Sequence, residues 1–251
     1  MYKQIFEKIE NSLLLNYGLS KSEFDNEFFS FKSLNYSIKS DAYYFDILKF
    51  IPFYAGFKTE TVLKKVDVIN KYFPDYKIVS NYSSEEVDKM MNDPEMIKNL
   101  NKINSIIKNA KAFVNLINEY GSIHNYIESF KPNNAIDNLF LLKHSLQNTF
   151  SYLGEITVFH FMTEIGLNVL KPDRVIQRIF ERLGLIVDRG QILESISIGQ
   201  QMAFETGYPI RYVDVILVIF GQIAKNGICF EEKPKCNLCQ LSSNCNYNSK
   251  K

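Results

Sequence analysis

Four cysteines near the C-terminus constrain this chain more than any other feature of its 251 residues. They stand at Cys229, Cys236, Cys239 and Cys245 with the spacing C-x6-C-x2-C-x5-C, and the rest of the chain contains none. Cytosolic proteins rarely form disulfides, whereas thiolates bind soft metals and iron–sulfur clusters. We therefore expect residues 229–245 to fold around a metal centre.

Zinc and an iron–sulfur cluster are the two metal centres to compare. Zinc ribbons usually pair two C-x2-C knuckles, and only Cys236 and Cys239 form one here. The bacterial ferredoxin run does not match either. The spacing resembles the cluster loop of the endonuclease III branch of helix-hairpin-helix DNA glycosylases, which implies a [4Fe–4S] cluster, with zinc as the alternative. Lys233 and Lys235 flank Pro234, and this basic loop is expected to contact DNA phosphate.

Helical periodicity governs nearly all of the remaining sequence. Apolar residues recur at helical spacing in segments such as 2–16. Ser83 and Glu86 have the spacing of a capping box, which marks a helix start. Residues 76–81 alternate weakly, but a single short strand would have no partner. The sequence predicts an all-α protein without internal repeats, and His160, on an apolar stretch, is expected in its core.

The net charge of +1 at pH 7 gives no overall support for nucleic-acid binding. All five arginines nevertheless fall between Arg174 and Arg211, and the arginine fork suits phosphate. Arg174 and Arg178 are therefore candidate DNA contacts, although chance clustering in a lysine-rich chain remains open. The N-terminus lacks the pattern of a secretory signal, and no apolar run approaches a membrane span. A cytoplasmic protein without membrane contact is expected.

The segment from Tyr152 to Thr157 reads YLGEIT, and Asp173 follows at the expected start of a later helix. This arrangement resembles the signature of the helix-hairpin-helix DNA glycosylase superfamily. The resemblance implies that the hairpin presents backbone N–H groups to DNA phosphate, as helix N-termini can, with Leu153, Gly154 and Thr157 at the contact. It also implies that Asp173 lies at the mouth of a pocket between two helical lobes.

Asp173 is the residue that we expect to perform the chemistry. Hydrolysis of an N-glycosidic bond builds positive charge on the sugar, and a fixed carboxylate can stabilise that charge or orient the attacking water. The alternative interpretation is an ordinary acidic residue in a first helical turn, where the helix dipole favours it. The hairpin upstream and the cysteine loop downstream favour the catalytic role.

The hairpin departs from the superfamily pattern, which reads roughly G-V-G-x-K-T-A. Only Gly154 and Thr157 match, and Tyr152 stands where the first glycine would be. Members that also cleave the DNA strand use a hairpin lysine to form a Schiff base, and Ile156 occupies that place here. We therefore expect a monofunctional glycosylase that lacks lyase activity and leaves an abasic site.

The N-terminal half resembles the 3-methyladenine DNA glycosylase I family. The similar segments are YFDILKFIPFYAGFKTETVLKK at 44–65, IIKNAKAFVNLINEYGSIHNYIESF within 103–130, and residues 150–166. That family has a base-pocket glutamate where Ile51 stands and a stacking tryptophan where Thr59 stands, and its terminal Cys and His metal site is not matched. The resemblance implies a damaged, alkylated base as substrate without fixing which one.

A flipped base needs aromatic faces and an apolar pocket, and the chain has 20 Phe and 15 Tyr but no Trp. Tyr43, Tyr44, Phe53 and Tyr54 lie in the segment that lines the pocket in the relatives. A cationic alkylated purine would gain cation–π attraction there, although each aromatic residue could instead belong to the core. Glu60 is the nearest acidic residue that could replace the missing pocket carboxylate.

These observations predict a two-lobed, all-α helix-hairpin-helix glycosylase fold with a C-terminal iron–sulfur cluster loop. One lobe spans 45–155 and holds the base pocket and hairpin, and the other combines 1–44 with 156–251. The expected partner is double-stranded DNA with a damaged base, bound by a monomer. A non-catalytic iron–sulfur DNA-binding protein of the same fold is the first alternative. An electron-transfer iron–sulfur protein is the second, and it gives no reason for the Asp173 segment.

Overall fold

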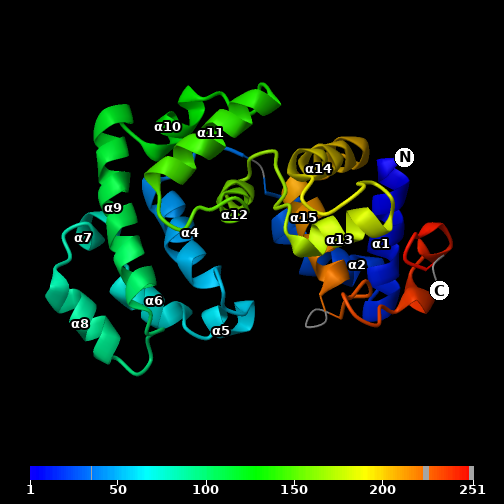
Figure 1. The fold of residues 1–251 in the computed structure, drawn as a ribbon, viewed down its shortest axis with the longest axis horizontal. Coiled ribbons are helices and arrows are strands. Elements are labelled where there is room, and N and C mark those ends of the chain that lie inside the picture. Colours follow the sequence, from blue (N-terminus) through cyan, green and yellow to red (C-terminus); the bar gives the residue numbers. More distant parts are fainter. Residues whose placement is uncertain (35, 223–225, 249–251) are drawn as a thin grey trace. The chain divides into compact units, whose positions relative to one another are not determined.

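The computed structural model describes residues 1–34, 36–222 and 226–248, apart from the side chain of Thr59. All regular structure within these residues is helical, and they contain no strand. The predicted all-α class is therefore confirmed. Contacts divide the chain into two compact units, whose ribbons are shown in Figure 1. The terminal unit comprises Met1–Tyr36 and Gly166–Lys251, and the central unit comprises Ser37–Ile165.

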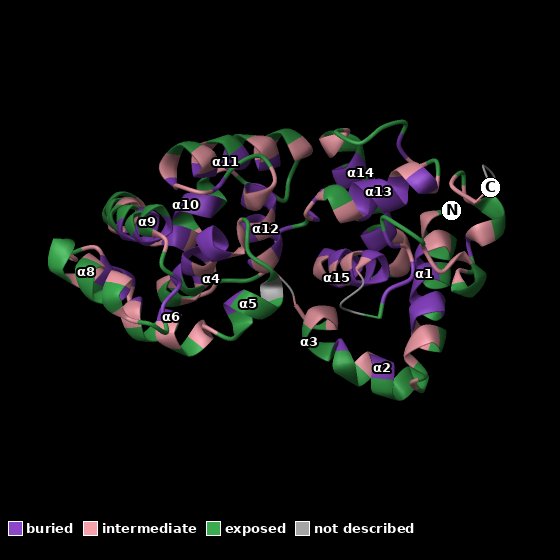
Figure 2. Cartoon of the chain, turned by 60° about the horizontal axis from the view of Figure 1, so that its bottom comes forward, coloured by how far each residue is buried: buried purple, intermediate pink, exposed green. Residues whose placement is uncertain are grey.

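The terminal unit is built around an apolar helix close to the C-terminus. Its helices are α1 (Tyr2–Tyr17), α2 (Lys21–Glu27), α3 (Phe29–Lys32), α13 (Arg174–Arg182), α14 (Ile192–Thr206) and α15 (Ile210–Gly221), with the short 3-10 helices η2 (Cys236–Leu238) and η3 (Ser242–Asn244). A helix that is apolar on nearly every side must be enclosed, and Figure 2 shows α15 largely buried. It packs against α13, α14 and α1. No helix of the described residues is long and apolar enough to cross a lipid bilayer.

Helix α2 begins at a capping box that is not among the sequence predictions. The Ser20 hydroxyl accepts a hydrogen bond from the Glu23 amide at 3.3 Å, and Glu23 Oε2 accepts one from the Ser20 amide at 2.8 Å. These bonds satisfy amides that a helix N-terminus leaves open. Phe24 then packs on Phe28, with ring centroids 4.7 Å apart.

The central unit is organised around its longest helix, α9. Its helices are α4 (Asp41–Tyr54), α5 (Thr59–Leu63), α6 (Val66–Tyr72), α7 (Tyr76–Val79), α8 (Ser84–Asn92), α9 (Leu100–Tyr120), α10 (Ile123–Ser129), α11 (Ile136–Thr149) and α12 (Thr157–Glu164). Helix α9 packs against α4, α7, α8 and α10 (Figure 1). The capping box predicted at Ser83 and Glu86 is confirmed at the start of α8. The weakly alternating segment 76–81 contains helix α7, which Asp75 caps.

The division into units falls at different residues from the expected lobes. The expected boundaries were 44/45 and 155/156, whereas contacts divide the chain at 36/37 and 165/166. Helix α12 belongs to the central unit because it packs against α4 and α11. Its Phe159 ring lies 6.0 Å from that of Phe140, and its His160 ring lies 5.7 Å from that of Tyr54. The hairpin and both helices that flank it therefore share one unit.

Candidate active site

Asp173 is the N-cap residue of α13. Its Oδ1 accepts hydrogen bonds from the amides of Val175 at 2.9 Å and Ile176 at 3.1 Å. Within the described residues, Oδ2 accepts no hydrogen bond, and Lys171 Nζ lies 3.9 Å from it. The side chain is 21% exposed. One carboxylate oxygen is thus fixed by the helix, whereas the other lies near the Lys171 ammonium.

The hairpin before α12 is organised by Thr157. Its Oγ1 donates to the Tyr152 carbonyl at 2.6 Å and accepts from the Gly154 amide at 2.7 Å. Tyr152 has φ of 67°, a left-handed conformation that favours glycine. The superfamily pattern has glycine at this position, so the chain makes the same turn with a less suited residue. The side chain of Leu153 is buried, which leaves only its backbone for a DNA contact.

Glu155 extends from the same hairpin with an exposed side chain. Lys143 Nζ lies 2.6 Å from Glu155 Oε2, and Gln147 donates to Oε1 at 3.1 Å. The hydrogen bond from Lys143 holds the pKa of Glu155 below its usual range. Lys143 thus offsets the negative charge that Glu155 places on the hairpin.

The four cysteines line a single cavity in the terminal unit. Its other lining residues are Arg182, Ile228, Pro234, Ser242 and Tyr247. Arg182 ties this loop to α13, because its guanidinium donates to the carbonyls of Phe230 at 2.6 Å and Glu231 at 2.8 Å. Its Nη1 also lies 3.4 Å from Cys229 Sγ. The Arg182 guanidinium carbon lies 4.1 Å from the centroid of the Tyr247 ring, which also lines this cavity.

The chemistry of this donor set suits a soft metal. Burial raises the pKa of the Cys229 thiol, with Arg182 opposing the shift, and burial raises the pKa of Cys239 to about 11. Such thiols become thiolates when a metal supplies the compensating positive charge. Among the described residues, however, no three His, Cys, Asp or Glu side chains, these cysteines included, are already gathered as a metal-binding group.

Arg178 occupies a different environment from the one that the sequence suggested. Its side chain is buried, and its guanidinium donates to the carbonyls of Gly221 at 2.7 Å and Cys229 at 3.0 Å and to Glu231 Oε2 at 2.8 Å. Since Arg178 lies one helical turn before Arg182 and bonds to the same loop, its buried guanidinium supports the cysteine loop. Arg174, by contrast, is exposed.

The basic residues of the cysteine loop differ in exposure. Lys233 is exposed and has φ of 49°, whereas Lys235 is half-buried with Nζ 5.5 Å from the Phe230 ring centroid. Lys233 therefore has the more accessible ammonium group for an external anion.

The five expected base-pocket residues differ in burial. Tyr44 and Phe53 are fully buried in the central unit, where the Tyr44 hydroxyl bonds to His124 Nδ1 at 3.1 Å. Burial raises the pKa of Tyr44 to about 12. Tyr43 and Tyr54 are half-buried, and Glu60 is exposed on α5. Tyr44 and Phe53 are thus core residues, whereas Tyr43 and Tyr54 keep part of their side chains accessible.

Two side chains that the sequence did not assign to the site lie beside these tyrosines. His160 is half-buried and not in the core as expected, because its Nε2 lies 3.3 Å from Glu164 Oε1 and its ring packs 5.7 Å from that of Tyr54. The Tyr43 hydroxyl donates to the Glu164 carbonyl at 3.2 Å. Burial raises the pKa of Tyr54, and the nearby charge of Glu164 adds to the shift. The one-turn spacing of His160 and Glu164 on α12 could have indicated this pair from the sequence.

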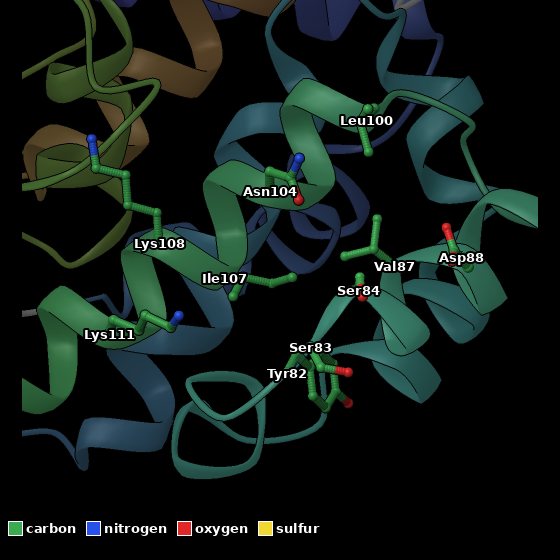
Figure 3. A pocket seen from close by; sticks show the side chains of 10 residues that line it. All are labelled: Tyr82, Ser83, Ser84, Val87, Asp88, Leu100, Asn104, Ile107, Lys108 and Lys111. Carbon is green, nitrogen blue, oxygen red and sulfur yellow. The ribbon is translucent and has the colours of Figure 1, made fainter.

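A separate cavity lies between α8 and α9 (Figure 3). Lys108 and Lys111 of α9 and Ser83 at the start of α8 are among its lining residues. None of the five expected base-pocket residues lines it. The Ser83 hydroxyl and amide are already engaged in the capping box with Glu86, so this cavity offers no open helix terminus and we assign it no part in the site.

The sequence model of the methyladenine glycosylase family matches residues 35–173, which is more than half of the chain. The protein belongs to the methyladenine glycosylase family. The matched region of this family member contains the entire central unit and ends at Asp173.

Two solved structures share the fold of this family member over most of the chain. An endonuclease III in a trapped covalent DNA intermediate is 16% identical, with 92% of this chain and 98% of that chain covered and a TM-score of 0.60. The 8-oxoguanine glycosylase/lyase of Methanocaldococcus jannaschii, solved with DNA, is 19% identical, with 86% and 95% covered and a TM-score of 0.54. These two similarities confirm the predicted helix-hairpin-helix glycosylase fold. The Staphylococcus aureus 3-methyladenine DNA glycosylase I is 20% identical, with 60% and 88% covered and a TM-score of 0.47.

Proposed function

We propose that this protein is a DNA glycosylase that hydrolyses the N-glycosidic bond of an alkylated base, with Asp173 as the catalytic carboxylate. Membership of the methyladenine glycosylase family supports the activity. The observation that supports the role of Asp173 is the difference between its two oxygens: two amides hold Oδ1, whereas Oδ2 lies 3.9 Å from Lys171 Nζ and accepts no hydrogen bond within the described residues.

The proposed reaction adds water across the bond between the sugar and the base. As that bond breaks, positive charge develops on the deoxyribose, and Oδ2 of Asp173 stabilises it or accepts a hydrogen bond from the attacking water. The water oxygen joins the sugar carbon, its proton is released, and the base leaves with the bonding electron pair. An alkylated, cationic purine leaves readily because departure neutralises its charge.

Replacement of Asp173 by asparagine separates catalysis from helix capping. Asparagine caps a helix about as well as aspartate, so Asp173→Asn keeps the two amide bonds and removes the negative charge. Base release from methylated duplex DNA, measured by mass spectrometry, should fall by about 100-fold or more. Unchanged release would assign Asp173 to capping alone. DNA binding without any base release by the wild type would favour the non-catalytic DNA-binding alternative.

The proposed enzyme is monofunctional, because Ile156 occupies the place of the hairpin lysine. Lys171 is the amine to test against this proposal, since its Nζ lies 3.9 Å from Asp173 Oδ2. Borohydride reduction during the reaction should give no covalent protein–DNA product. A trapped product that disappears in Lys171→Gln would instead identify a Schiff base and a lyase step.

The base pocket that we propose uses Tyr54, His160 and Glu164 of the central unit. The Tyr54 ring offers a face to a purine, and Glu164 supplies negative charge for a cationic base. Glu164, rather than the exposed Glu60, then takes the place of the missing pocket carboxylate. Glu164→Gln should weaken release of cationic methylated purines and spare neutral lesions, whereas Glu60→Gln, the matched control, should change neither.

The four cysteines are proposed to hold a [4Fe–4S] cluster, with zinc as the alternative. Their convergence on one cavity, beside the guanidinium of Arg182, supports a soft-metal centre. When bound, the cluster would cross-link parts of the cysteine loop to one another, and the hydrogen bonds of Arg182 tie that loop to α13. Purified protein should contain about four iron and four inorganic sulfide atoms per chain. One zinc and no sulfide would establish the alternative, and Cys239→Ala should lose the metal in either case.

DNA binding is proposed through the hairpin backbone at Gly154 and Thr157 and through the exposed side chains of Arg174 and Lys233. Phosphate contacts release counterions, so each should contribute about one unit to the slope of affinity against salt concentration on logarithmic scales. Arg174→Gln and Lys233→Gln should each reduce that slope. Replacement of the buried Arg178 should leave the slope unchanged. The protein is proposed to be a monomer, and size-exclusion chromatography should give the corresponding mass.

A further inference from the structure

Asp214 is a buried carboxylate in the interior of the terminal unit. It lies on α15 and is 3% exposed. Its Oδ1 accepts the backbone amide of Lys171 at 2.8 Å, and its Oδ2 accepts Arg211 Nη1 at 2.7 Å. The Arg211 guanidinium in turn lies 5.0 Å from the Phe31 ring centroid. The Asp214 carboxylate therefore binds the backbone two residues before Asp173.

The segment that leads into α13 has few backbone N–H groups that can bind another part of the protein. Pro172 has no amide hydrogen, and the Asp173 amide donates locally to the Lys171 carbonyl at 2.8 Å. The Lys171 amide is thus the donor through which this turn is bound to another helix. Gln177 adds a second restraint, because its Nε2 donates to the Pro172 carbonyl at 2.5 Å.

Stability alone gives a weak reason for a carboxylate at this place. Removing a charge from water is costly, and a buried ion pair often stabilises no better than apolar residues of the same volume. A carboxylate does, however, accept a shorter and stronger hydrogen bond from a backbone amide than a neutral acceptor would. Displacement of a reacting group by about 1 Å can cost about 100-fold in rate.

We propose that Asp214 is a positioning residue that sets the place of Asp173 by holding the Lys171 amide. The inference rests on the proposed catalytic role of Asp173. Asp214 acts through the Lys171–Pro172 turn, and Arg211 keeps its carboxylate oriented. Asp214→Ala releases the turn, whereas Asp214→Asn retains a carbonyl oxygen for the Lys171 amide.

A double-mutant cycle with Asp173→Asn tests this relation. In the wild-type background, Asp214→Ala should lower the single-turnover rate on methylated duplex DNA by about ten-fold or more while leaving DNA affinity unchanged. Asp214→Asn should recover most of that rate. In the Asp173→Asn background, Asp214→Ala should cause no further loss, because its effect passes through the missing carboxylate. An equal loss in both backgrounds would overturn the proposal.

Glu10→Gln is the matched control for a general loss of stability. Glu10 is also a buried carboxylate of the terminal unit, bonded to Tyr212 and 3.0 Å from Lys21 Nζ, and its contacts within the described residues do not include the Asp173 turn. A rate loss in Glu10→Gln as large as that in Asp214→Ala would also refute positioning. Hydrogen exchange of residues 170–176 provides a readout independent of rate, and unchanged protection in Asp214→Ala would reject the proposal. Full activity of Asp173→Asn alone would instead refute the proposed function.

Discussion

Replacement of Arg182 by lysine is the sharpest test of how the cysteine loop is held. The guanidinium makes two hydrogen bonds to the carbonyls of Phe230 and Glu231, approaches Cys229 Sγ and stacks on Tyr247. Lysine keeps the positive charge but loses the planar fork, so a single ammonium cannot reach both carbonyls in the same geometry. The substitution therefore removes contacts without removing charge.

The size of the effect follows from the contacts that are lost. A hydrogen bond from a charged donor contributes about 1.5–3 kcal/mol, so loss of both carbonyl bonds costs about 3–6 kcal/mol. Because Arg182 is 6% exposed, solvent screening offsets little of this loss. We expect Arg182→Lys to destabilise the terminal unit by about 3–6 kcal/mol. At a urea m-value of about 2 kcal/mol per molar, the unfolding midpoint falls by roughly 2 M.

Urea titration with pulsed hydrogen exchange, followed on peptides of α13 and α15, measures this loss within the terminal unit. Arg189→Lys is the matched control: Arg189 is 39% exposed and pairs with Glu181 and Glu231 at 2.8 and 3.1 Å. Exposed pairs contribute less than about 1 kcal/mol, so the control should move the midpoint little. Equal shifts for the two variants, or a loss below about 1 kcal/mol for Arg182→Lys, would refute the reasoning.

Three further perturbations probe other parts of the chain. Gly199→Ala should destabilise the terminal unit by about 1–3 kcal/mol in urea titrations, because an added Cβ would overlap the Leu170 side chain. Ser83→Ala should remove the α8 cap and lower the unfolding free energy of the central unit by about 0.5–2 kcal/mol. Glu155→Gln should cost less than about 1 kcal/mol near pH 7, since Glu155 is largely exposed. The hydrogen bond from Lys143 lowers the pKa of Glu155 in the folded protein. The extra stability of the wild type over Glu155→Gln is therefore complete above the pKa of Glu155 in the unfolded chain, and it is lost as the pH falls through the folded-state pKa. Urea midpoints of both proteins at pH 7 and pH 3 would check this.

Local features of the fold could be predicted from the sequence because they depend on nearby residues. The capping box of Ser83 and Glu86 and the start of a helix at Asp173 each require only side chains within one helical turn. The cysteines are likewise close in sequence, and their four thiols line one cavity.

The candidate site was less predictable because its contacts join residues that are far apart in sequence. Arg178 looked like a phosphate ligand from its residue type, but its acceptors Gly221 and Cys229 come from a distant segment. Glu60 was near the pocket segment along the chain, whereas Glu164 reaches Tyr54 through the packing of α12 on α4. Residue type predicts what a side chain can bind, and only tertiary packing decides which partner is present.

Helix α13 connects the cysteine loop to Asp173, and this connection affects how the protein should respond to oxidation. Its first turn fixes the carboxylate of Asp173, and its last turn holds the cysteine loop through Arg182. Its nine residues span only about 14 Å. Oxidation of the thiols would displace the cysteine loop and with it Arg182 at the C-terminal end of α13. Because the helix is short and rigid, the displacement would reach the Asp173 carboxylate at its N-terminal end. If Asp173 acts as proposed, oxidation of the thiols should reduce base release before the protein itself unfolds.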